Sequence, residues 1–265
     1  TKLSKYLSPQ IYNSIFTGAQ TVEIASSRKK LTIFFSDVVN FTETTDKLES
    51  EELTSLLNHY LTEMSRIALE FGATIDKYIG DAIVAVFGAP LDDPDHASNA
   101  VSAALHCRAR LEELDPSVLH GRKLTQRIGI NSGNVLVGNI GSRQRFNYTV
   151  MGDAVNLASR LEGANKYFGT SIMVSQTTFA AARPAYAWRE LDMIRVVGRA
   201  EPVTIYEPLA KAGEETKEQV ARAAAYAAGL AHWRARDFSR CVGSLASIAG
   251  ADPPARALLS LSLIH

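Results

Sequence analysis

Short apolar segments alternate along this chain with longer amphipathic segments, and this order constrains the fold more than any other feature of the sequence. Residues 31–35 form a continuous run of β-branched and aromatic side chains, which is typical of a buried strand. Residues 50–72 have the apolar spacing of a helix, with acidic residues in the first turn. Two further apolar runs, 73–79 and 82–87, are separated only by a Gly-Asp pair, which predicts an antiparallel hairpin.

The second half of the chain repeats this order. Helical periodicity covers 95–114 and again 154–167. Between these helices we expect two strands, 127–131 and 135–138, joined by a Ser-Gly turn at 132–133. Three more strands are expected at 172–174, 191–197 and 203–206, with a short helix at 176–182. The order predicts an α/β or α+β sandwich in which helices cover a mixed sheet.

Composition divides the chain into three segments. Residues 1–30 carry apolar positions at near-helical spacing and end in a basic cluster, so we interpret them as an amphipathic connector. A frayed helix packed on the core is an equal alternative. Residues 31–210 hold the predicted sheet and its helices. From 211 to 265 the composition shifts to Ala, Glu and Arg, which predicts a helical tail.

The tail has a loose repeat-like pattern. It is similar to one weak tetratricopeptide-like unit at Gly229, Trp233, Phe238, Leu245 and Pro253. A single repeat cannot bury its own apolar face. The tail therefore packs on the rest of the chain as a helical cap, begins a longer array or binds a partner, and the loose pattern favours the cap.

Charge and cysteine content exclude several classes of protein. The 28 Lys and Arg residues balance 28 Asp and Glu residues, so no general attraction to nucleic acid or to an anionic membrane is expected. Cys107 and Cys241 stand far apart outside any metal-binding spacing, which indicates neither a disulfide framework nor structural zinc and fits a reducing cytoplasm. No apolar stretch has the length of a membrane span. We expect a cytoplasmic protein, or the cytoplasmic portion of a larger or membrane-anchored one.

Two acidic residues mark the ends of predicted strands. Asp37 follows the strand 31–35, and Asp81 lies at the tip of the hairpin. If these strands are neighbours, the two carboxylates form an oxygen-only pair suited to Mg²⁺ or Mn²⁺. Taken singly, each residue is more simply explained as a turn residue, because Gly-Asp turns are common.

Four long motifs change this balance, because they follow one another in the order and spacing of one family. They are FFSDVVNFT at 34–42, DKYIGDAIVAVFGAP at 76–90, GINSGNVLVGNIG at 129–141 and YTVMGDAVNLASRLE at 148–162. Together they resemble the class III nucleotide cyclase catalytic domain over about 30–207. The resemblance implies the ferredoxin-like mixed sheet of that fold. It also implies that residues 3–16 are a coupling segment to an upstream sensor or membrane domain.

The resemblance assigns a metal and phosphate site. Asp37 and Asp81, with the backbone of Val38, would hold two Mg²⁺ or Mn²⁺ ions that activate the ribose 3′-hydroxyl and brace the triphosphate. Either Asp37 or solvent could take the proton of that hydroxyl. The backbone N–H groups of one segment would bind the phosphates, namely those of Val38, Val39, Asn40, Phe41 and Thr42.

A helix carries the residues expected to act in the transition state. Asn156 and Arg160 are four positions apart on the predicted helix 154–167 and therefore share one face. Alone, this spacing is typical of a solvated helix surface. In the family, the matching asparagine orients the ribose, and the matching arginine stabilises the charge that builds on the α-phosphate.

A further pair matches the purine-selecting positions of the family. Lys77 can only donate, which suits adenine N1, and the hydroxyl of Thr149 can accept from the 6-amino group. Guanine would present an N–H to Lys77 and leave a donor unpaired, at a cost of about 1–3 kcal/mol. A hydroxyl can also donate, so we expect softer discrimination than with a fixed acceptor. Threonine at this position resembles a bacterial subgroup of adenylyl cyclases. Without the motif, Lys77 would be a strand lysine at a solvent edge.

Three positions depart from the family pattern. Arg199 replaces the usual triphosphate-binding lysine, Asn40 the usual glycine of the first motif, and Asn134 the usual polar or basic residue after Ser-Gly. Arginine keeps the charge of lysine but changes its geometry.

The resemblance implies an adenylate cyclase that converts ATP to 3′,5′-cyclic AMP and pyrophosphate for intracellular signalling. In the family, the metal aspartates come from one subunit and the purine, ribose and transition-state residues from the other. This chain has both sets, so a homodimer would hold two equivalent sites. The alternatives are a guanylyl or mixed-specificity cyclase and a catalytically silent cyclase-like dimerisation or binding module.

Overall fold

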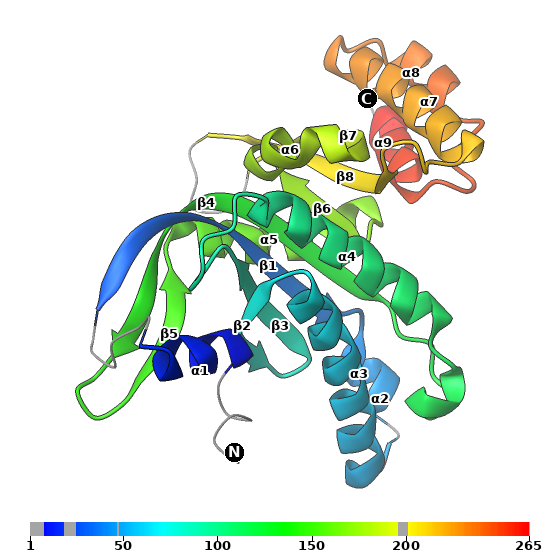
Figure 1. The fold of residues 1–265 in the computed structure, drawn as a ribbon. Coiled ribbons are helices and arrows are strands. Elements are labelled where there is room, and N and C mark those ends of the chain that lie inside the picture. Colours follow the sequence, from blue (N-terminus) through cyan, green and yellow to red (C-terminus); the bar gives the residue numbers. More distant parts are fainter. Residues whose placement is uncertain (1–7, 19–24, 47, 196–200, 265) are drawn as a thin grey trace.

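The computed structural model describes residues 8–18, 25–46, 48–195 and 201–264. A mixed sheet with the strand order β2-β3-β1-β4-β6-β8-β7 crosses the molecule, and β5 pairs with β4 beside this path (Figure 1). The eight strands are β1 (Ser26–Val38), β2 (Ala73–Ile79), β3 (Ala82–Phe87), β4 (Gln126–Gly141), β5 (Phe146–Met151), β6 (Ile172–Ser175), β7 (Tyr186–Ile194) and β8 (Val203–Lys211). The predicted α/β sandwich with a helix-covered mixed sheet is confirmed.

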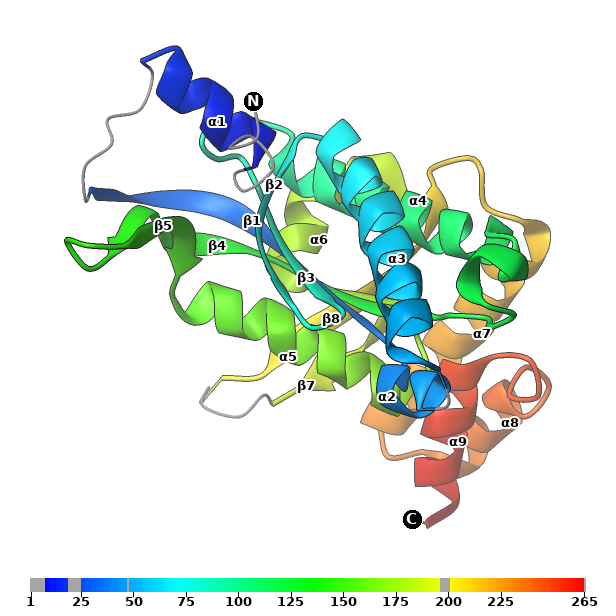
Figure 2. The same ribbon diagram turned by 90° about the horizontal axis from the view of Figure 1, so that it is seen from below.

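Helices cover both faces of this sheet. Figure 2 shows α5 on one side of β1 and β4, and α3 with α4 on the other side. The helices of the described residues are α1 (Pro9–Phe16), α2 (Phe41–Thr45), α3 (Ser50–Glu70), α4 (His96–Glu113), α5 (Asp153–Phe168), α6 (Gln176–Ala182), α7 (Lys217–Arg234), α8 (Phe238–Leu245) and α9 (Pro253–Ile264), with 3₁₀ turns at Pro116–Leu119 and Arg183–Ala185. None of the described helices is both long and apolar enough to cross a membrane.

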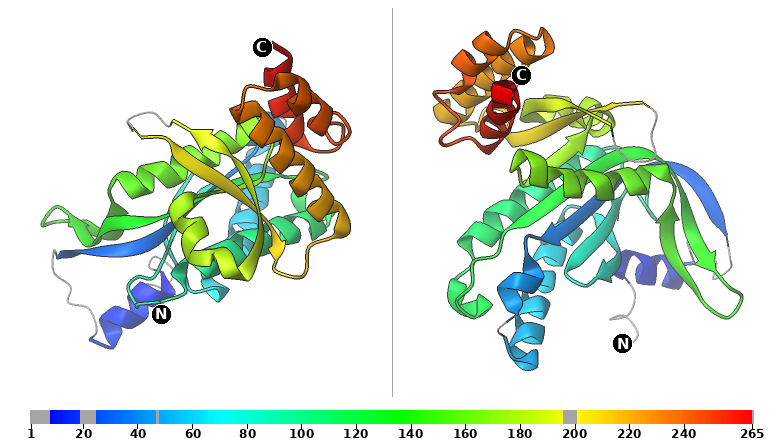
Figure 3. Two further views of the ribbon diagram at one scale, coloured as in Figure 1. Left: turned by 90° about the horizontal axis from the view of Figure 1, so that it is seen from above. Right: turned by 180° about the vertical axis from the view of Figure 1, so that it is seen from behind.

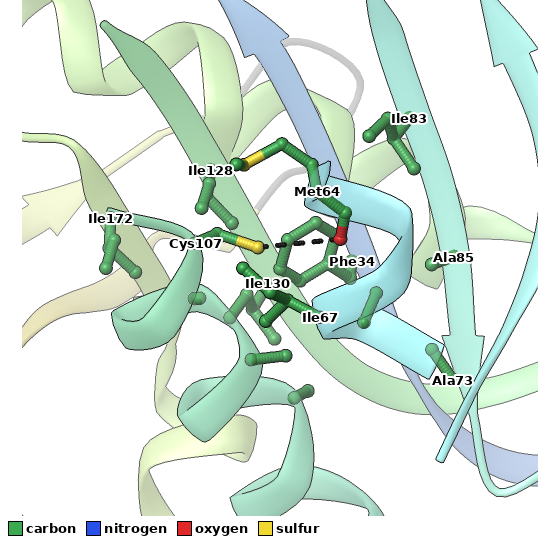
Figure 4. Packing of buried hydrophobic residues seen from close by; sticks show 14 of the residues in the cluster. Phe34, Met64, Ile67, Ala73, Ile83, Ala85, Cys107, Ile128, Ile130 and Ile172 are labelled. Atoms are coloured by element: carbon green, nitrogen blue, oxygen red, sulfur yellow. Dashed lines mark hydrogen bonds between the residues drawn. The ribbon is translucent and has the colours of Figure 1, made fainter. Parts of the chain in front are cut away.

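Burial on both faces explains the continuous apolar run of β1. Phe34 points into the cluster under α3 and α4, with Met64, Ile67 and Cys107 (Figure 4). Its neighbour Ile33 points to the opposite face, into a cluster that includes residues of α5. A strand that is buried on both faces loses the alternation of apolar and polar residues. β1 therefore has the sequence pattern of an interior strand, and it lies between β3 and β4 in the sheet.

The predicted hairpin at 132–133 is wrong. β4 runs without a turn through Ser132 and Gly133, which pair with Thr32 and Leu31 on β1. Glycine is needed here for packing: a Cβ on Gly133 would lie 2.9 Å from the Cβ of Ala154. The true hairpin joins β4 to β5, a strand that the sequence analysis did not predict.

β1 begins earlier than the sequence suggested. Residues 26–30, assigned above to the connector, pair with 134–138 of β4 and extend the sheet into a long arm. They are mostly exposed polar residues, so apolar periodicity gave no sign of a strand there. β7 begins at Tyr186, earlier than the predicted strand 191–197, and β8 continues past the predicted 203–206 to Lys211. Residues 196–197 of the predicted strand lie outside the described residues.

The C-terminal tail is a three-helix unit with its own small core, which includes Tyr226, Leu230 and Leu245. A Cβ on Gly229 would lie 2.5 Å from the side chain of Leu245, so glycine permits α7 and α8 to cross closely. The unit packs against β7 and the end of α5, far from the β4–β5 arm (Figure 3). It therefore rests on the sheet domain, as expected of a cap.

Candidate active site

Two aspartates from different strands meet at one end of the sheet. Asp37 is the penultimate residue of β1, and Asp81 lies at the tip of the β2–β3 hairpin. β1 pairs with β3 as far as Ser36 and Ile83, and this pairing brings the two carboxyl groups within hydrogen-bonding distance. Asp81 Oδ2 also accepts a hydrogen bond from the N–H of Val38 at 3.0 Å. The sheet thus places both carboxyl groups at the same point.

The electrostatics of this acid pair favour a cation. Burial, the hydrogen bond to Asp81 and the charges of Asp81 and Glu162 raise the pKa of Asp37 to about 7, whereas the charge of Arg127 lowers it. Two carboxylates in contact do not both ionise readily without a nearby positive charge. Mg²⁺ binds proteins through one or two carboxylates and takes its other oxygens from water and substrate phosphates. The donor set therefore fits Mg²⁺ or Mn²⁺.

Arg127 on β4 joins this acid pair to α5. The strand register places it opposite Asp37, and its Nη2 lies 3.8 Å from Asp37 Oδ2. Its Nε donates to Glu162 Oε1 on α5 at 2.8 Å. Asn156 and Arg160 lie on the same helix. Arg127 and Glu162 were not predicted as site residues, because their link to the aspartates depends on the strand register between β1 and β4, which no motif specifies.

The segment expected to bind phosphate leaves β1 and enters α2. The N–H of Val38 is taken by Asp81, and that of Val39 donates to the carbonyl of Thr125 at 2.8 Å. These two groups are therefore already satisfied within the chain, in contrast to the expectation from sequence. The N–H groups of 40–42 lie at the start of α2, where the first turn of a helix has no internal acceptors.

A second cluster joins β2 to β5. Lys77 Nζ donates to Thr149 Oγ1 at 3.2 Å, so the two residues expected to select the purine lie in contact. The hydroxyl of Thr149 in turn donates to Asp76 Oδ2 at 2.9 Å. Burial raises the pKa of Asp76, while Lys77 and the hydrogen bond from Thr149 lower it. Asp76 was not singled out from the sequence, although it stands beside Lys77 in the second motif.

The expected transition-state residues lie on α5, as predicted. Asn156 is exposed near the start of the helix, and Arg160 follows one turn later. Arg160 Nη1 is buried and has no hydrogen-bond partner among the described residues. Gly129 permits α5 to lie close on β4, because a Cβ there would be 2.2 Å from the carbonyl oxygen of Ala158. Arg199 lies outside the described residues.

The arrangement matches one family. The sequence model of the adenylate and guanylate cyclase catalytic domain matches residues 24–207, which is more than half of the chain. The chain belongs to this family. The match begins just before β1 and ends in β8, so the cyclase domain includes the β1–β4 arm and excludes the three tail helices.

Similar proteins support this assignment. Adenylate cyclase 1 of Rhizobium meliloti is 35% identical over 186 residues, which cover 69% of this chain and 28% of that protein. The crystal structure of the adenylyl cyclase CyaB from P. aeruginosa is 39% identical, with a TM-score of 0.66 over 73% of this chain and 98% of that one. The guanylyl cyclase Cya2 is 35% identical, with a TM-score of 0.65 over 73% and 98% of the two chains. The chain spans well under half the length of the curated relatives that it matches.

The cyclase fold explains one departure from the family pattern. Asn40 has a φ of 52°, in the left-handed region. Glycine adopts this conformation without strain, and asparagine is among the few other residues that adopt it readily. Asn40, just before α2, therefore occupies a position with a positive φ that glycine also tolerates.

Proposed function

We propose that this cyclase domain is an adenylate cyclase that converts ATP to 3′,5′-cyclic AMP and pyrophosphate. The observation that carries the proposal is the contact between Lys77 and Thr149, which gives one edge of the site a cationic donor next to a hydroxyl. Adenine has an acceptor at N1 and a donor at its 6-amino group, so both of its groups find partners. Guanine has the opposite pattern at these two positions.

The acid pair would hold two Mg²⁺ or Mn²⁺ ions, with the carbonyl of Val38 as a further ligand. Bound there, the ions would activate the ribose 3′-hydroxyl and neutralise charge on the triphosphate. Asp81 also ties the end of β1 to the hairpin tip, because its Oδ2 accepts a hydrogen bond from the N–H of Val38. The N–H groups of 40–42, at the start of α2, would then face the phosphates.

Asn156 would orient the ribose, and Arg160 would stabilise charge on the α-phosphate during attack by the 3′-oxygen. The planar guanidinium suits a charge that spreads over several oxygens. Arg199 would bind the triphosphate. In one chain, the acid pair interacts with Arg127, whereas Arg160 Nη1 has no partner in the described part of the chain.

We therefore place each active site between two copies of the chain. The acid pair would come from one subunit, and Lys77, Thr149, Asn156 and Arg160 from its partner. Apolar side chains that a monomer leaves exposed lie on β2 and on the β4–β5 arm, namely Tyr78, Ile79, Leu136 and Met151. These are four of the exposed large apolar side chains of the described residues, and exposed apolar groups near the proposed purine-selecting residues would be covered by a second copy. A homodimer would have two complete sites, and a monomer would be inactive.

A guanylyl cyclase is the second candidate, because solved guanylyl cyclases are also similar to this chain. Lys77 opposes it. The chain has both the aspartates of the proposed metal site and the residues proposed to bind the purine, ribose and α-phosphate, which argues against a catalytically silent binding module. We also propose a cytoplasmic location, because ATP is the proposed substrate, and an upstream sensor or membrane domain that would control cyclic AMP production for intracellular signalling.

The test is cyclic nucleotide formation from ATP and from GTP, with Mg²⁺ and with Mn²⁺, over a dilution series of the protein. Preferential formation of cyclic AMP, with a specific activity that falls on dilution, supports both the adenine site and the shared site. Preferential formation of cyclic GMP would overturn the substrate assignment. No turnover of either nucleotide at high protein concentration would favour the binding module.

A further inference from the structure

The environment of Thr149 differs from that expected for a lone hydroxyl. A hydroxyl has one proton and two lone pairs, so its contacts decide whether it donates or accepts. In this structure its proton goes to Asp76 Oδ2 at 2.9 Å, and one lone pair receives Lys77 Nζ at 3.2 Å. One lone pair remains, and the hydroxyl has no proton left for another acceptor.

A β-bulge brings Asp76 to this position. The register between β2 and β3 shifts between Ile75 and Lys77, so two residues of β2 oppose one of β3. Ile75 packs into the cluster under α3, and Tyr78 reaches the same side, with its hydroxyl 2.9 Å from Ser65 Oγ. In a regular strand, residues three apart point to opposite faces. The bulge therefore turns Asp76 and Lys77 together toward β5.

The Asp76 carboxylate is buried with incomplete hydrogen bonding, which disfavours the folded state. Its side chain is only 4% exposed, and Oδ1 is buried without a hydrogen-bond partner among the described residues. Lys77 Nζ lies 3.5 Å from Oδ2 and partly balances the charge. A buried acceptor that is not fully satisfied is rare in folded proteins and calls for an explanation.

We propose that Asp76 sets the purine selectivity of the site by taking the proton of Thr149, so that the hydroxyl offers only a lone pair to the base. This inference rests on the proposed function. Asp76 is a positioning residue that acts through Thr149. It makes threonine a fixed acceptor for the 6-amino group of adenine and leaves guanine O6 opposite a lone pair. Selectivity is therefore sharper than a freely rotating hydroxyl would give.

The variant that tests this is Asp76→Asn, which keeps the shape of the side chain. An amide can donate its N–H to Thr149, and the hydroxyl proton is then free to turn toward guanine O6. The ratio of kcat/KM for ATP to that for GTP should fall roughly tenfold, which corresponds to one hydrogen bond of about 1.4 kcal/mol. The matched control is Asp92→Asn, which neutralises a carboxylate that is 88% exposed and paired with Lys29. It should leave the ratio unchanged.

Two further measurements separate this role from a structural one. A purine nucleoside triphosphate with hydrogen in place of the 6-amino group has nothing to give Thr149, so Asp76→Asn should leave its kcat/KM unchanged. In a Thr149→Val background, Asp76→Asn should no longer change the ATP to GTP ratio. An unchanged ratio in Asp76→Asn, or an equal change in the valine background, overturns the proposal.

Equilibrium binding of ATP and GTP to the same proteins distinguishes failure of this inference from failure of the proposed function. If the protein forms no cyclic nucleotide, the proposed activity is wrong. Loss of preferential ATP binding in Asp76→Asn would then still support the role of Asp76. Binding discrimination that is identical in the wild type and in Asp76→Asn would exclude that role, whether or not the protein turns over nucleotide.

Discussion

The backbone N–H of Val38 donates to Asp81 Oδ2 at 3.0 Å, and this bond ties the end of β1 to the tip of the β2–β3 hairpin. Asp81 therefore has two roles, one in the backbone arrangement and one as a proposed metal ligand. The two roles can be tested separately, because asparagine retains an oxygen that accepts the bond but loses the charge.

We expect Asp81→Asn to lower kcat by about 10²-fold or more while the protein stays folded, since removal of one preorganised charge at a reacting phosphate has effects of this size. Asp81→Ala should lose the same activity and also some stability, because the N–H of Val38 loses its acceptor. Cyclic AMP formation and urea denaturation measure the two effects. Wild-type turnover in Asp81→Asn would exclude Asp81 as a metal ligand.

Complementation tests the shared site. Asp37→Ala and Arg160→Ala should each be inactive alone. In an equimolar mixture, about half of the dimers are mixed and each has one intact site, so about a quarter of the wild-type activity should return. Specific activity of the mixture, measured after subunit exchange, decides the point. A mixture as inactive as its components would show that the two residues serve one chain's own site.

Arg189 connects the tail to the sheet domain. Its guanidinium donates to Glu207 Oε2 at 2.6 Å and to Asp252 Oδ1 at 2.6 Å, and all three side chains are buried. Arg189→Met leaves two buried carboxylates without a partner, which should lower the free energy of unfolding by about 3–5 kcal/mol. Chemical denaturation measures this loss. The control is Arg240→Met, at a side chain that is 75% exposed, which should change the free energy of unfolding by less than about 0.5 kcal/mol.

The decrease in the free energy of unfolding caused by Arg189→Met should become smaller as the pH falls. Burial raises the pKa of Glu207, and Arg189 opposes this shift. Without the arginine the folded state binds a proton on Glu207 more tightly than the unfolded state does, so acid favours folding. A loss that stays constant from neutral to mildly acidic pH would indicate that the carboxylates find other partners.

Asp76→Asn should not destabilise the protein at neutral pH. Burial raises the pKa of Asp76 above its ordinary value despite Lys77 and Thr149, so the charged form disfavours folding above that pKa. The wild type gains stability as the pH falls through the folded-state pKa, and the asparagine variant lacks this gain. Its free energy of unfolding should equal or exceed that of the wild type at pH 7, and the difference should narrow in acid. Marked destabilisation at pH 7 would contradict this balance.

Two glycines near α5 should respond oppositely to alanine. At Gly129, a Cβ would lie 2.2 Å from the backbone of α5, so Gly129→Ala must displace the helix that carries Asn156 and Arg160. We expect a loss of stability of about 1–3 kcal/mol and reduced kcat. Gly163→Ala meets nothing within 4 Å and should stabilise the helix by about 0.5–1 kcal/mol. Thermal unfolding measures the Tm of both variants. Similar changes in Tm would mean that α5 does not pack closely against β4 at Gly129.

Local pattern was sufficient where an element is defined by its own residues. The helix that carries Asn156 and Arg160 and the hairpin that carries Asp81 were predicted with nearly their observed bounds. Strands 26–30 and 146–151 were missed for different reasons. Residues 26–30 are mostly exposed polar residues that pair with a distant part of β4, whereas 146–151 forms a hairpin with the end of β4 and has Val150 as its one buried residue, so it lacks a continuous apolar run. Gly133 misled the prediction, because a glycine required for helix packing has the same sequence signal as a glycine in a turn.

Periodicity and motif spacing are local properties of a chain, and they were sufficient to predict the fold class and the family and to single out the candidate site residues. The tertiary structure decided which of those residues meet. Arg127 lies beside Asp37 through a strand register, and Asp76 reaches Thr149 through a bulge in β2. Pairing between distant strands depends on the free energy of the whole sheet, so no local pattern specifies it. The direction in which the Thr149 hydroxyl points is a consequence of that pairing.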